Sequence, residues 1–223
     1  MARFTTPMNT LLFSAAFAGM ASYNVDAASE DRWFLRPQVG LSLISDFQAR
    51  SNKVAGFSGP AEIKLDNGFA AGIGIGYRYS PNFAVELAWE YRSNDSEALI
   101  DGGTSLGSGN YASNTFFLNG LYFFSQSGRW QPYLGAGLSW LQEIDLDFEQ
   151  DGVESSYSGD GDIGYQLFAG LNYDLTPDWG LQTELRYGSI TSITLESEAG
   201  DGSSFSGMDY QPFTVQVGLI YRF

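Results

Sequence analysis

The sequence predicts an all-β protein, an eight-stranded antiparallel transmembrane β-barrel of the up-and-down type. The first observation behind this prediction is the C-terminal segment 213–223, which alternates without a break between apolar odd positions and mostly polar or small even positions. When a pattern repeats every two residues, alternate side chains lie on opposite faces of a strand. One apolar and one polar face are typical of a strand that lies between lipid and a filled interior.

Composition is the second observation. The 223 residues include 17 Phe, 13 Tyr and 5 Trp, yet the mean hydropathy is only −0.14. A helical span needs about 20 consecutive apolar residues, whereas the longest apolar stretch, 11–21, has 11 residues and includes a serine. A soluble β-sandwich is the alternative. We favour the barrel because the alternating pattern recurs along the chain.

The N-terminus predicts a signal peptide over residues 1–27, followed by a barrel domain over 28–223. Arg3 supplies positive charge, 11–21 supply a short apolar core, and Val25 and Ala27 are the small residues expected before cleavage. An earlier cleavage site at Ala21 and a start at Met8 remain open. The chain has no cysteine, so neither a lipoprotein signal nor disulfides are expected.

The third observation is that eight segments alternate in this way. They are 33–44, 69–79, 83–92, 115–124, 130–140, 163–175, 179–187 and 213–223. Tight connections at 80–82, 125–129 and 176–178 alternate with long polar ones at 45–67, 93–113, 142–162 and 188–209, as in membrane barrels. Segment 115–124 is apolar on both faces, and we expect Phe116, Leu118, Tyr122 and Phe124 to face outward.

The predicted inward faces carry a nearly balanced set of charges. An eight-stranded barrel is just wide enough for side chains to fill it, so these charges predict a plug of ion pairs in which Glu86 lies within diagonal reach of Arg78. Inward glycines keep a narrow path open as an alternative. The set is Arg36, Arg78, Glu86, Glu90, Arg92, Asp174, Glu184, Arg186 and Arg222.

No catalytic residue, cofactor site or established metal site is expected. The chain has neither His nor Cys, which excludes a histidine base, a thiolate nucleophile and a Cys/His zinc site. Glu86 and Glu90 share a face and could act as acid and base, but buried charges of this kind are normally paired. The sequence therefore predicts a protein that is not an enzyme.

The net charge of −15 is concentrated in the long connections. In 142–162 five carboxylates alternate with Ile144, Leu146 and Phe148, and this phase predicts that the carboxylates lie on the interior side. A solvated acidic loop and a mouth that attracts Ca²⁺ or Mg²⁺ are both consistent with the pattern, whereas a nucleic-acid partner is not. The five are Glu143, Asp145, Asp147, Glu149 and Asp151.

Several motifs carry a resemblance to a known family. Segments 119–124, 131–137 and 171–179, with the C-terminal Tyr221-Arg222-Phe223, are similar to those of eight-stranded bacterial outer-membrane β-barrels such as OmpA-type transmembrane domains and opacity-type porin-family proteins. The resemblance implies a monomer in the cell outer membrane, in contact with lipid and lipopolysaccharide. It also implies that Tyr221 and Phe223 form the signal read by the barrel assembly machinery.

Such motifs identify a fold more strongly than a function. Two classes of function therefore stay open. One is a structural or surface-interaction role, in envelope integrity, adhesion or recognition through four long acidic loops. The other is a narrow porin-like channel for small solutes or cations.

Overall fold

The computed structural model describes residues 32–124, 128–150 and 153–223. The predicted signal peptide lies outside these residues, and its boundary stays a prediction. The described chain is all-β, and it holds no helix long and apolar enough to cross a membrane. Its strands are β1 (Trp33–Leu43), β2 (Phe47–Val54), β3 (Phe57–Leu65), β4 (Gly68–Arg78), β5 (Phe83–Ile100), β6 (Thr104–Phe123), β7 (Trp130–Gln150), β8 (Val153–Gly159), β9 (Ile163–Asp174), β10 (Trp179–Ser197), β11 (Ser204–Tyr210) and β12 (Phe213–Arg222).

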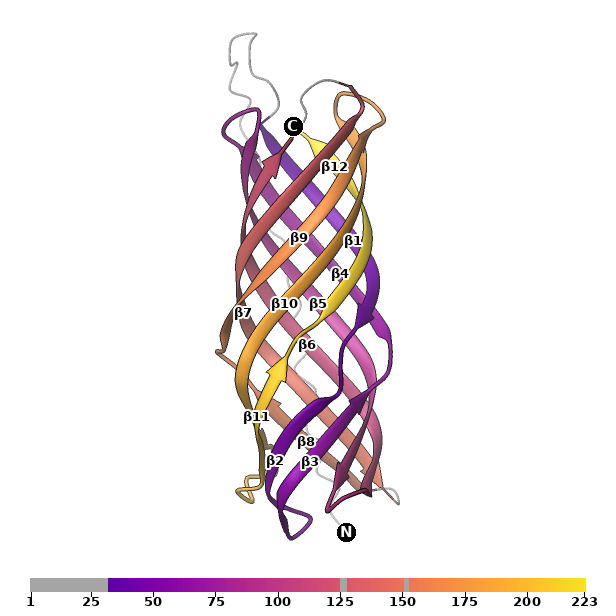
Figure 1. Cartoon of the computed structure of the whole chain (residues 1–223), viewed down its shortest axis with the longest axis vertical. Helices are drawn as coiled ribbons and strands as arrows, with labels where there is room; N and C mark the ends of the chain where they lie inside the picture. The colour runs from indigo at the N-terminus through magenta and orange to yellow at the C-terminus, as the bar shows by residue number, and fades with distance from the viewer. Residues whose placement is uncertain (1–31, 125–127, 151–152) are drawn as a thin grey trace, which may run out of the picture. The chain divides into compact units, whose positions relative to one another are not determined.

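One circuit of antiparallel pairing closes the end of the barrel that carries the short turns (Figure 1). It runs from β1 through β4, β5, β6, β7, β9 and β10 to β12, which pairs back with β1. The two ends of the barrel chain meet there, because the Trp33 amide donates to the Phe223 carbonyl (3.3 Å) and the Phe223 amide donates to the Trp33 carbonyl (3.0 Å). The eight segments predicted from alternation lie on these eight strands.

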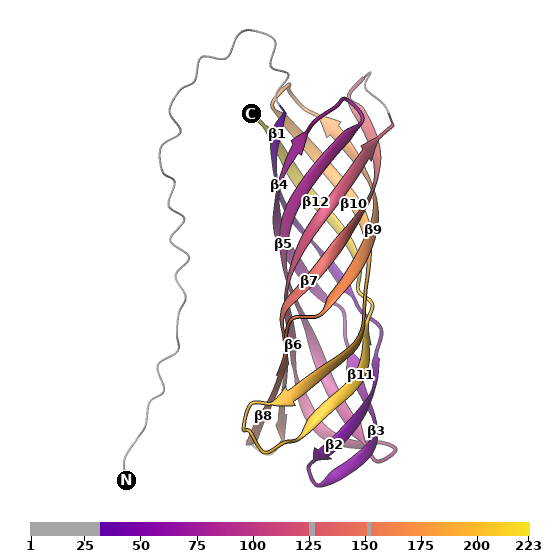
Figure 2. The ribbon, with the colours of Figure 1, turned by 90° about the vertical axis from the view of Figure 1, so that its left-hand side faces the viewer.

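The prediction of four long loops was wrong over most of their length, and the described residues form twelve strands, so the exact count of eight is not confirmed. Strands β2, β3, β8 and β11 lie within the expected loops, while β5, β6, β7 and β10 extend far into them. A second circuit runs from β2 through β3, β5, β6, β7, β8, β10 and β11 back to β2 (Figure 2). The barrel wall therefore continues well beyond the length expected from the sequence.

Strand length divides this barrel into two halves. A tilted strand crosses a bilayer in about 9–11 residues, whereas β5 has 18 residues and β7 has 21. We call the part built on β1, β4, β9 and β12 the turn half, and the part built on β2, β3, β8 and β11 the distal half. Strands β5, β6, β7 and β10 run through both.

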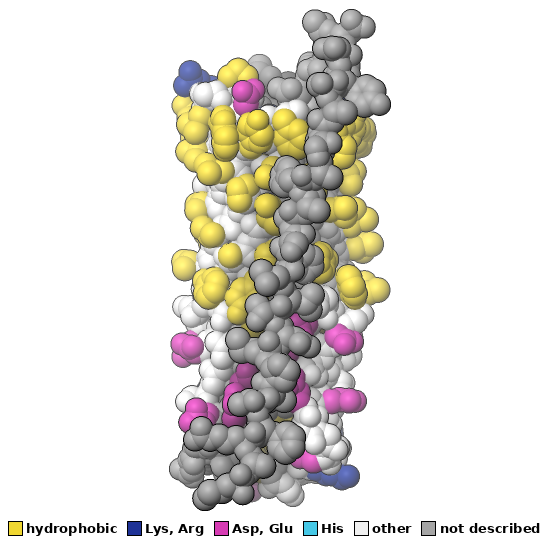
Figure 3. Space-filling view, turned by 180° about the vertical axis from the view of Figure 1, so that it is seen from behind, with side chains coloured by type: hydrophobic (Ala, Val, Ile, Leu, Met, Phe, Trp, Pro, Cys, Tyr) yellow, Lys and Arg dark blue, Asp and Glu magenta, His cyan; other side chains and the backbone are white. Residues whose placement is uncertain are grey.

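The two halves bury opposite faces. On β7, Leu138 in the turn half is 61% exposed on the outside, whereas Leu146 in the distal half is fully buried inside. Hydrophobic side chains accordingly gather on the turn half, and acidic ones are scattered over the distal half among other atoms (Figure 3). The buried residues of the distal half form an apolar core whose largest members include Phe47, Ile63, Tyr111, Ile144, Leu146, Phe148, Ile193 and Phe205.

Candidate functional site

The interior of the turn half is built around Arg36 of β1. Its Nε and Nη2 atoms donate to both carboxylate oxygens of Glu86 on β5, at 2.5 and 2.8 Å. Its Nη1 atom lies 3.6 Å from Oε2 of Glu184 on β10. A two-pronged guanidinium–carboxylate contact fixes orientation as well as charge, so one arginine of β1 links β5 and β10 across the interior.

The charges continue from Glu184 as an alternating chain. Arg186 lies 2.7 Å from Glu184 and 3.2 Å from Glu90, and Arg92 lies 2.6 Å from Glu90. Each of the six side chains is at most 4% exposed. Three arginines thus balance three glutamates, and every buried charge has an opposite neighbour, as burial requires. We call Glu86, Arg36, Glu184, Arg186, Glu90 and Arg92 the ion-pair chain.

Glycine at position 74 makes the Arg36–Glu86 contact possible. Gly74 of β4 pairs with Arg36, between β1 and β5. A Cβ atom built on Gly74 would lie 2.7 Å from the carboxylate carbon of Glu86. No side chain therefore covers the inward side of β4 at this position, and the Glu86 side chain extends over it from β5 to Arg36 on β1.

Uncharged side chains complete the hydrogen bonding of the glutamates. The Tyr133 hydroxyl donates to Glu184 (2.6 Å) and accepts from Gln182 (2.8 Å), Gln216 donates to Glu184 (2.6 Å), and Asn119 donates to Glu86 (3.0 Å). These residues were not among the predicted site residues. Their inward phase on predicted strands was the available signal, because an inward polar side chain beside a buried charge is a natural partner for it.

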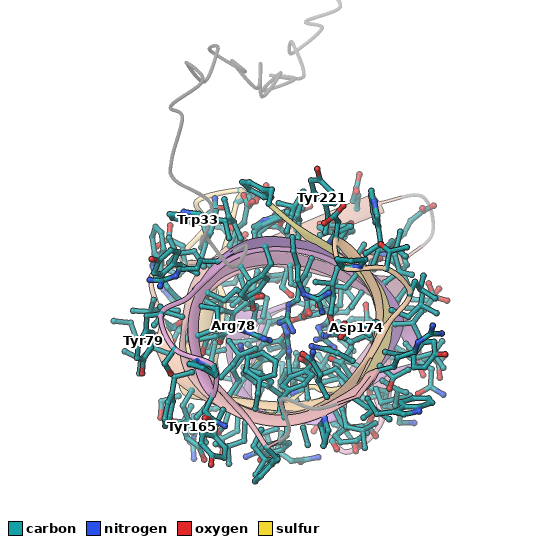
Figure 4. All side chains as sticks on the ribbon, turned by 90° about the horizontal axis from the view of Figure 1, so that it is seen from above. Trp33, Arg78, Tyr79, Tyr165, Asp174 and Tyr221 are labelled. Carbon is teal, nitrogen blue, oxygen red and sulfur yellow. The ribbon has the colours of Figure 1, made fainter. Side chains whose placement is uncertain are left out.

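The remaining predicted interior charges lie at the short-turn mouth, where Arg78 and Asp174 point into the barrel (Figure 4). Arg222 contacts Asp174 at 2.6 Å, in a pair that is partly exposed. Arg78 donates to Gln131 (3.3 Å), and its guanidinium lies 4.0 Å from the centre of the Phe123 ring.

The predicted pairing of Arg78 with Glu86 is wrong. Diagonal reach was possible, but Arg36 offers Glu86 both prongs of its guanidinium across the bare surface of Gly74. Of the nine predicted interior charges, the structure joins six in the ion-pair chain and places Arg78, Asp174 and Arg222 at the mouth.

The prediction that the row of carboxylates faces the interior is also wrong. Asn114 pairs with Glu143 while its neighbour Thr115 pairs with Leu141, so Gln142 is an extra residue in β7. Such a bulge shifts the alternation by one position. Ile144, Leu146 and Phe148 therefore point into the distal core and the carboxylates point outward. We call Glu143, Asp145, Asp147 and Glu149 the acidic row; Asp151 lies outside the described residues.

Crowding perturbs one member of the acidic row. Partial burial, followed by repulsion from Glu143, Glu198 and Asp147, raises the pKa of Asp145 to about 6. Within the described residues, no group of three acidic side chains is arranged to hold a metal ion. Contact between this row and divalent cations therefore stays a prediction.

Ladder pairing is absent from a stretch of the wall between residues 44–49 and 207–212. Pairing stops at Leu43 with Phe213 and resumes at Arg50 with Ser206. Pro212 has no amide hydrogen to give, and Gly207 has a φ of +72° that bends its strand. We call this stretch the wall gap; Tyr210 and Pro212, on its β11–β12 side, have buried side chains.

Comparisons with known proteins agree with this architecture. The chain matches the family model described as the outer membrane protein beta-barrel domain over residues 12–223. It is similar to outer membrane protein W of Vibrio cholerae, at 22% identity over 221 residues, covering 96% of this chain and 99% of that protein. It is also similar to an uncharacterised outer-membrane protein of Sinorhizobium fredii, at 24% identity over 238 residues, covering 99% and 96%.

Solved structures show the same fold. OprG from Pseudomonas aeruginosa superimposes with a TM-score of 0.66 at 15% identity, covering 87% of this chain and 97% of that one. Neisserial surface protein A gives a TM-score of 0.51 at 19% identity, covering 86% and 97%. At these identities the likeness is one of architecture alone.

Proposed function

Because the chain belongs to the outer membrane protein beta-barrel domain family, we propose that it is a non-enzymatic, non-conducting barrel with a structural or surface-interaction role. It is a protein of the outer membrane, as its relatives are. The apolar outside of the turn half fits the hydrocarbon of that membrane. The distal half, with a polar outside and an apolar inside, is suited to water.

The observation that carries the non-conducting proposal is the ion-pair chain. It crosses the interior at the level where a polar solute would have to pass, and its members bond to one another rather than line an opening. The cavity beside Arg92 and Arg186 holds about 20 Å³, and the one lined by Phe34, Arg36 and Arg78 holds about 10 Å³. These volumes suit single water molecules rather than hydrated ions. The ion-pair chain thus argues against the narrow channel.

Conductance in planar bilayers tests this proposal. The refolded barrel is expected to give no resolved current steps, whereas a Glu86→Ala, Arg36→Ala double variant removes one end of the ion-pair chain and is expected to leak. The heat-denatured protein serves as the control for detergent artefacts. Cation-selective steps from the wild-type barrel would replace this proposal with the channel.

The absence of enzymatic activity is supported by the state of the carboxylates. Glu86 and Glu90, the one pair that sequence spacing suggested for acid–base work, are bound to Arg36, Arg92 and Arg186. A general base needs a free lone pair directed at a substrate. Neither carboxylate is available in that sense.

A surface role is supported by the distal half, whose acidic outside and hairpin tips would stand clear of the membrane. In this proposal the barrel is a monomer, surrounded by lipid and lipopolysaccharide and recognised by the assembly machinery through Tyr221 and Phe223. Cysteine labelling tests the orientation, since the chain has no cysteine of its own. In intact cells, Asp101→Cys at a tip is expected to react with an impermeant maleimide and Asp178→Cys in a short turn is not. The reverse result would invert the topology.

A second candidate is a route for small apolar molecules. It is favoured by the apolar core of the distal half together with the wall gap, which lies where that core meets the ion-pair chain. A solute that displaced core side chains could leave sideways into lipid without crossing the charges. The test introduces Gln48→Cys and Asp209→Cys together, at exposed positions on opposite sides of the gap, so that a disulfide between them can close it. If the route operates, oxidation will slow uptake of a small apolar dye and reduction will restore it; equal rates would reject the route.

A further inference from the structure

A small cavity separates the ion-pair chain from the apolar core of the distal half. Its volume is about 20 Å³, and its lining comes from both sides of this boundary, with Glu90 and Arg186 on one side and Ile190 and Tyr210 on the other. This is room for one or two water molecules and too little for a larger ligand.

Three side chains that line the cavity each carry a buried polar atom without a partner among the described residues. They are Nε of Arg92, a donor, Oε1 of Gln166, an acceptor, and Oγ of Ser139, which can act as either. All three residues are at most 4% exposed. Bulk solvent therefore does not reach these atoms.

The other polar side-chain atoms of Arg92 and Gln166 are hydrogen-bonded. Arg92 donates from Nη1 to Ser42 (2.9 Å) and from Nη2 to Glu90 and Thr214 (both 2.6 Å). Gln166 donates from Nε2 to the Asn119 amide oxygen (2.6 Å). Because these bonds fix both side chains, neither can turn its unpartnered atom to another protein group without breaking them.

The balance of charges around the cavity indicates what kind of molecule can bind there. Arg92 and Arg186 are both in contact with Glu90, and the ion-pair chain as a whole carries three positive and three negative charges. A neutral site with a donor, an acceptor and a hydroxyl favours neither a cation nor an anion. Water supplies two donors and two acceptors and matches all three atoms.

We infer that one or two ordered water molecules bind in this cavity and link Arg92 to Ser139 and Gln166. The water forms the boundary layer between the charged and apolar parts of the interior. It completes the hydrogen bonding of Arg92, the last member of the ion-pair chain, where the apolar core begins.

Nuclear magnetic resonance of the folded barrel in lipid nanodiscs tests this inference directly. The Nε–H proton of Arg92 is expected to show a rotating-frame cross-relaxation peak to water, with the sign that distinguishes a bound molecule from chemical exchange. The matched controls lie in the same chain of charges, since the Nε–H groups of Arg36 and Arg186 donate to Glu86 and Glu184. Those two protons are expected to show no such peak. A resolved Arg92 signal without a water peak would overturn the inference.

Two substitutions sharpen the test. Ser139→Val places two methyl groups in the cavity and is expected to abolish the Arg92 water peak, whereas Ser139→Ala keeps the space and is expected to retain it. A peak of equal strength in a folded Ser139→Val barrel would place the water elsewhere and contradict the inference. Should the valine variant not fold, the wild-type comparison among the three arginines still gives the answer.

Discussion

The turn half and the distal half share four strands, yet they are packed in opposite senses. In the turn half, large apolar side chains such as Leu138 face outward and an ion-pair chain fills the interior; in the distal half, side chains such as Leu146 fill the interior and carboxylates face outward. The hydrogen-bonded ladders between β5, β6 and β7 run on through both halves. The solvent on the outside therefore determines which face is apolar, because a closed wall satisfies its own backbone in either medium.

The largest expected effect comes from breaking the interior of the turn half. Glu86→Ala removes the two-pronged partner of Arg36 and leaves a buried guanidinium with the longer contact to Glu184 and a hydrogen bond to the Tyr133 hydroxyl (3.2 Å). Removing one partner of a fully buried pair costs about 3–5 kcal/mol, so the urea midpoint of the barrel in lipid is expected to fall sharply. Glu154→Ala, at an exposed carboxylate of the distal half, is the control. An unchanged midpoint for Glu86→Ala would mean that water solvates the interior charges.

The next largest effect is a difference in lost stability between two truncations on the same strand, one in each half. Leu146→Ala hollows the distal core and is expected to cost about 2–5 kcal/mol, as large-to-small changes in packed cores do. Leu138→Ala, eight residues earlier on β7, removes the same atoms from the outer face and is expected to cost less, because lipid fills the space. Urea unfolding measures both changes, and proteolysis within 142–162 shows whether the first loosens the distal half alone. An equal loss of stability in the two variants would contradict the conclusion that the two halves bury opposite faces of β7.

Removal of Phe223 is expected to have a smaller effect on the folded barrel and a larger one on its assembly. Its backbone makes two hydrogen bonds with Trp33 that close the first circuit, and its ring lies 5.8 Å from that of Tyr221. Each hydrogen bond contributes about 1 kcal/mol net. The folded fraction on a semi-native gel is expected to drop while secretion is unchanged. Normal assembly would remove the basis for treating Tyr221 and Phe223 as a signal.

The turn half could be predicted from the sequence because each of its strands repeats one simple rule. Apolar side chains alternate from Phe213 to Phe223, and prolines at 81 and 177 mark two of the turns. The outward phase expected for Phe116, Leu118, Tyr122 and Phe124 agrees with their exposure, and Asn119 is buried.

The distal half could not be predicted in the same way. Its apolar residues point inward between acidic ones, so Ile144, Leu146 and Phe148 resembled scattered positions in a polar loop. The bulge at Gln142 leaves no mark in the sequence, although it reverses every side chain after it. The choice of Arg36 over Arg78 as the partner of Glu86 also depends on how the strands align around the barrel, which no local pattern contains.

The smallest expected effect concerns the outer surface of the distal half and depends on pH. Asp145 has a raised pKa, about 6 against an ordinary value of 3.8. Between roughly pH 4 and 6 the folded form therefore binds more protons than the unfolded form, and stability falls as pH rises through that window. Asp145→Asn cannot ionise, so it is expected to be more stable than the wild type at pH 7 and equal to it at pH 4. The difference should stay below about 1 kcal/mol, because solvent screens a half-buried charge.

Thermal unfolding at both pH values measures this difference in stability. Asp101→Asn at a hairpin tip controls for the loss of one negative charge. Salt at 1 M should shrink the difference, since the Debye length falls to about 3 Å. If Asp145→Asn were stabilised at pH 4 as much as at pH 7, the ionisation of Asp145 would not be the cause of the difference. Asp145 would then be strained by packing, and repulsion within the acidic row would not be what destabilises the folded form.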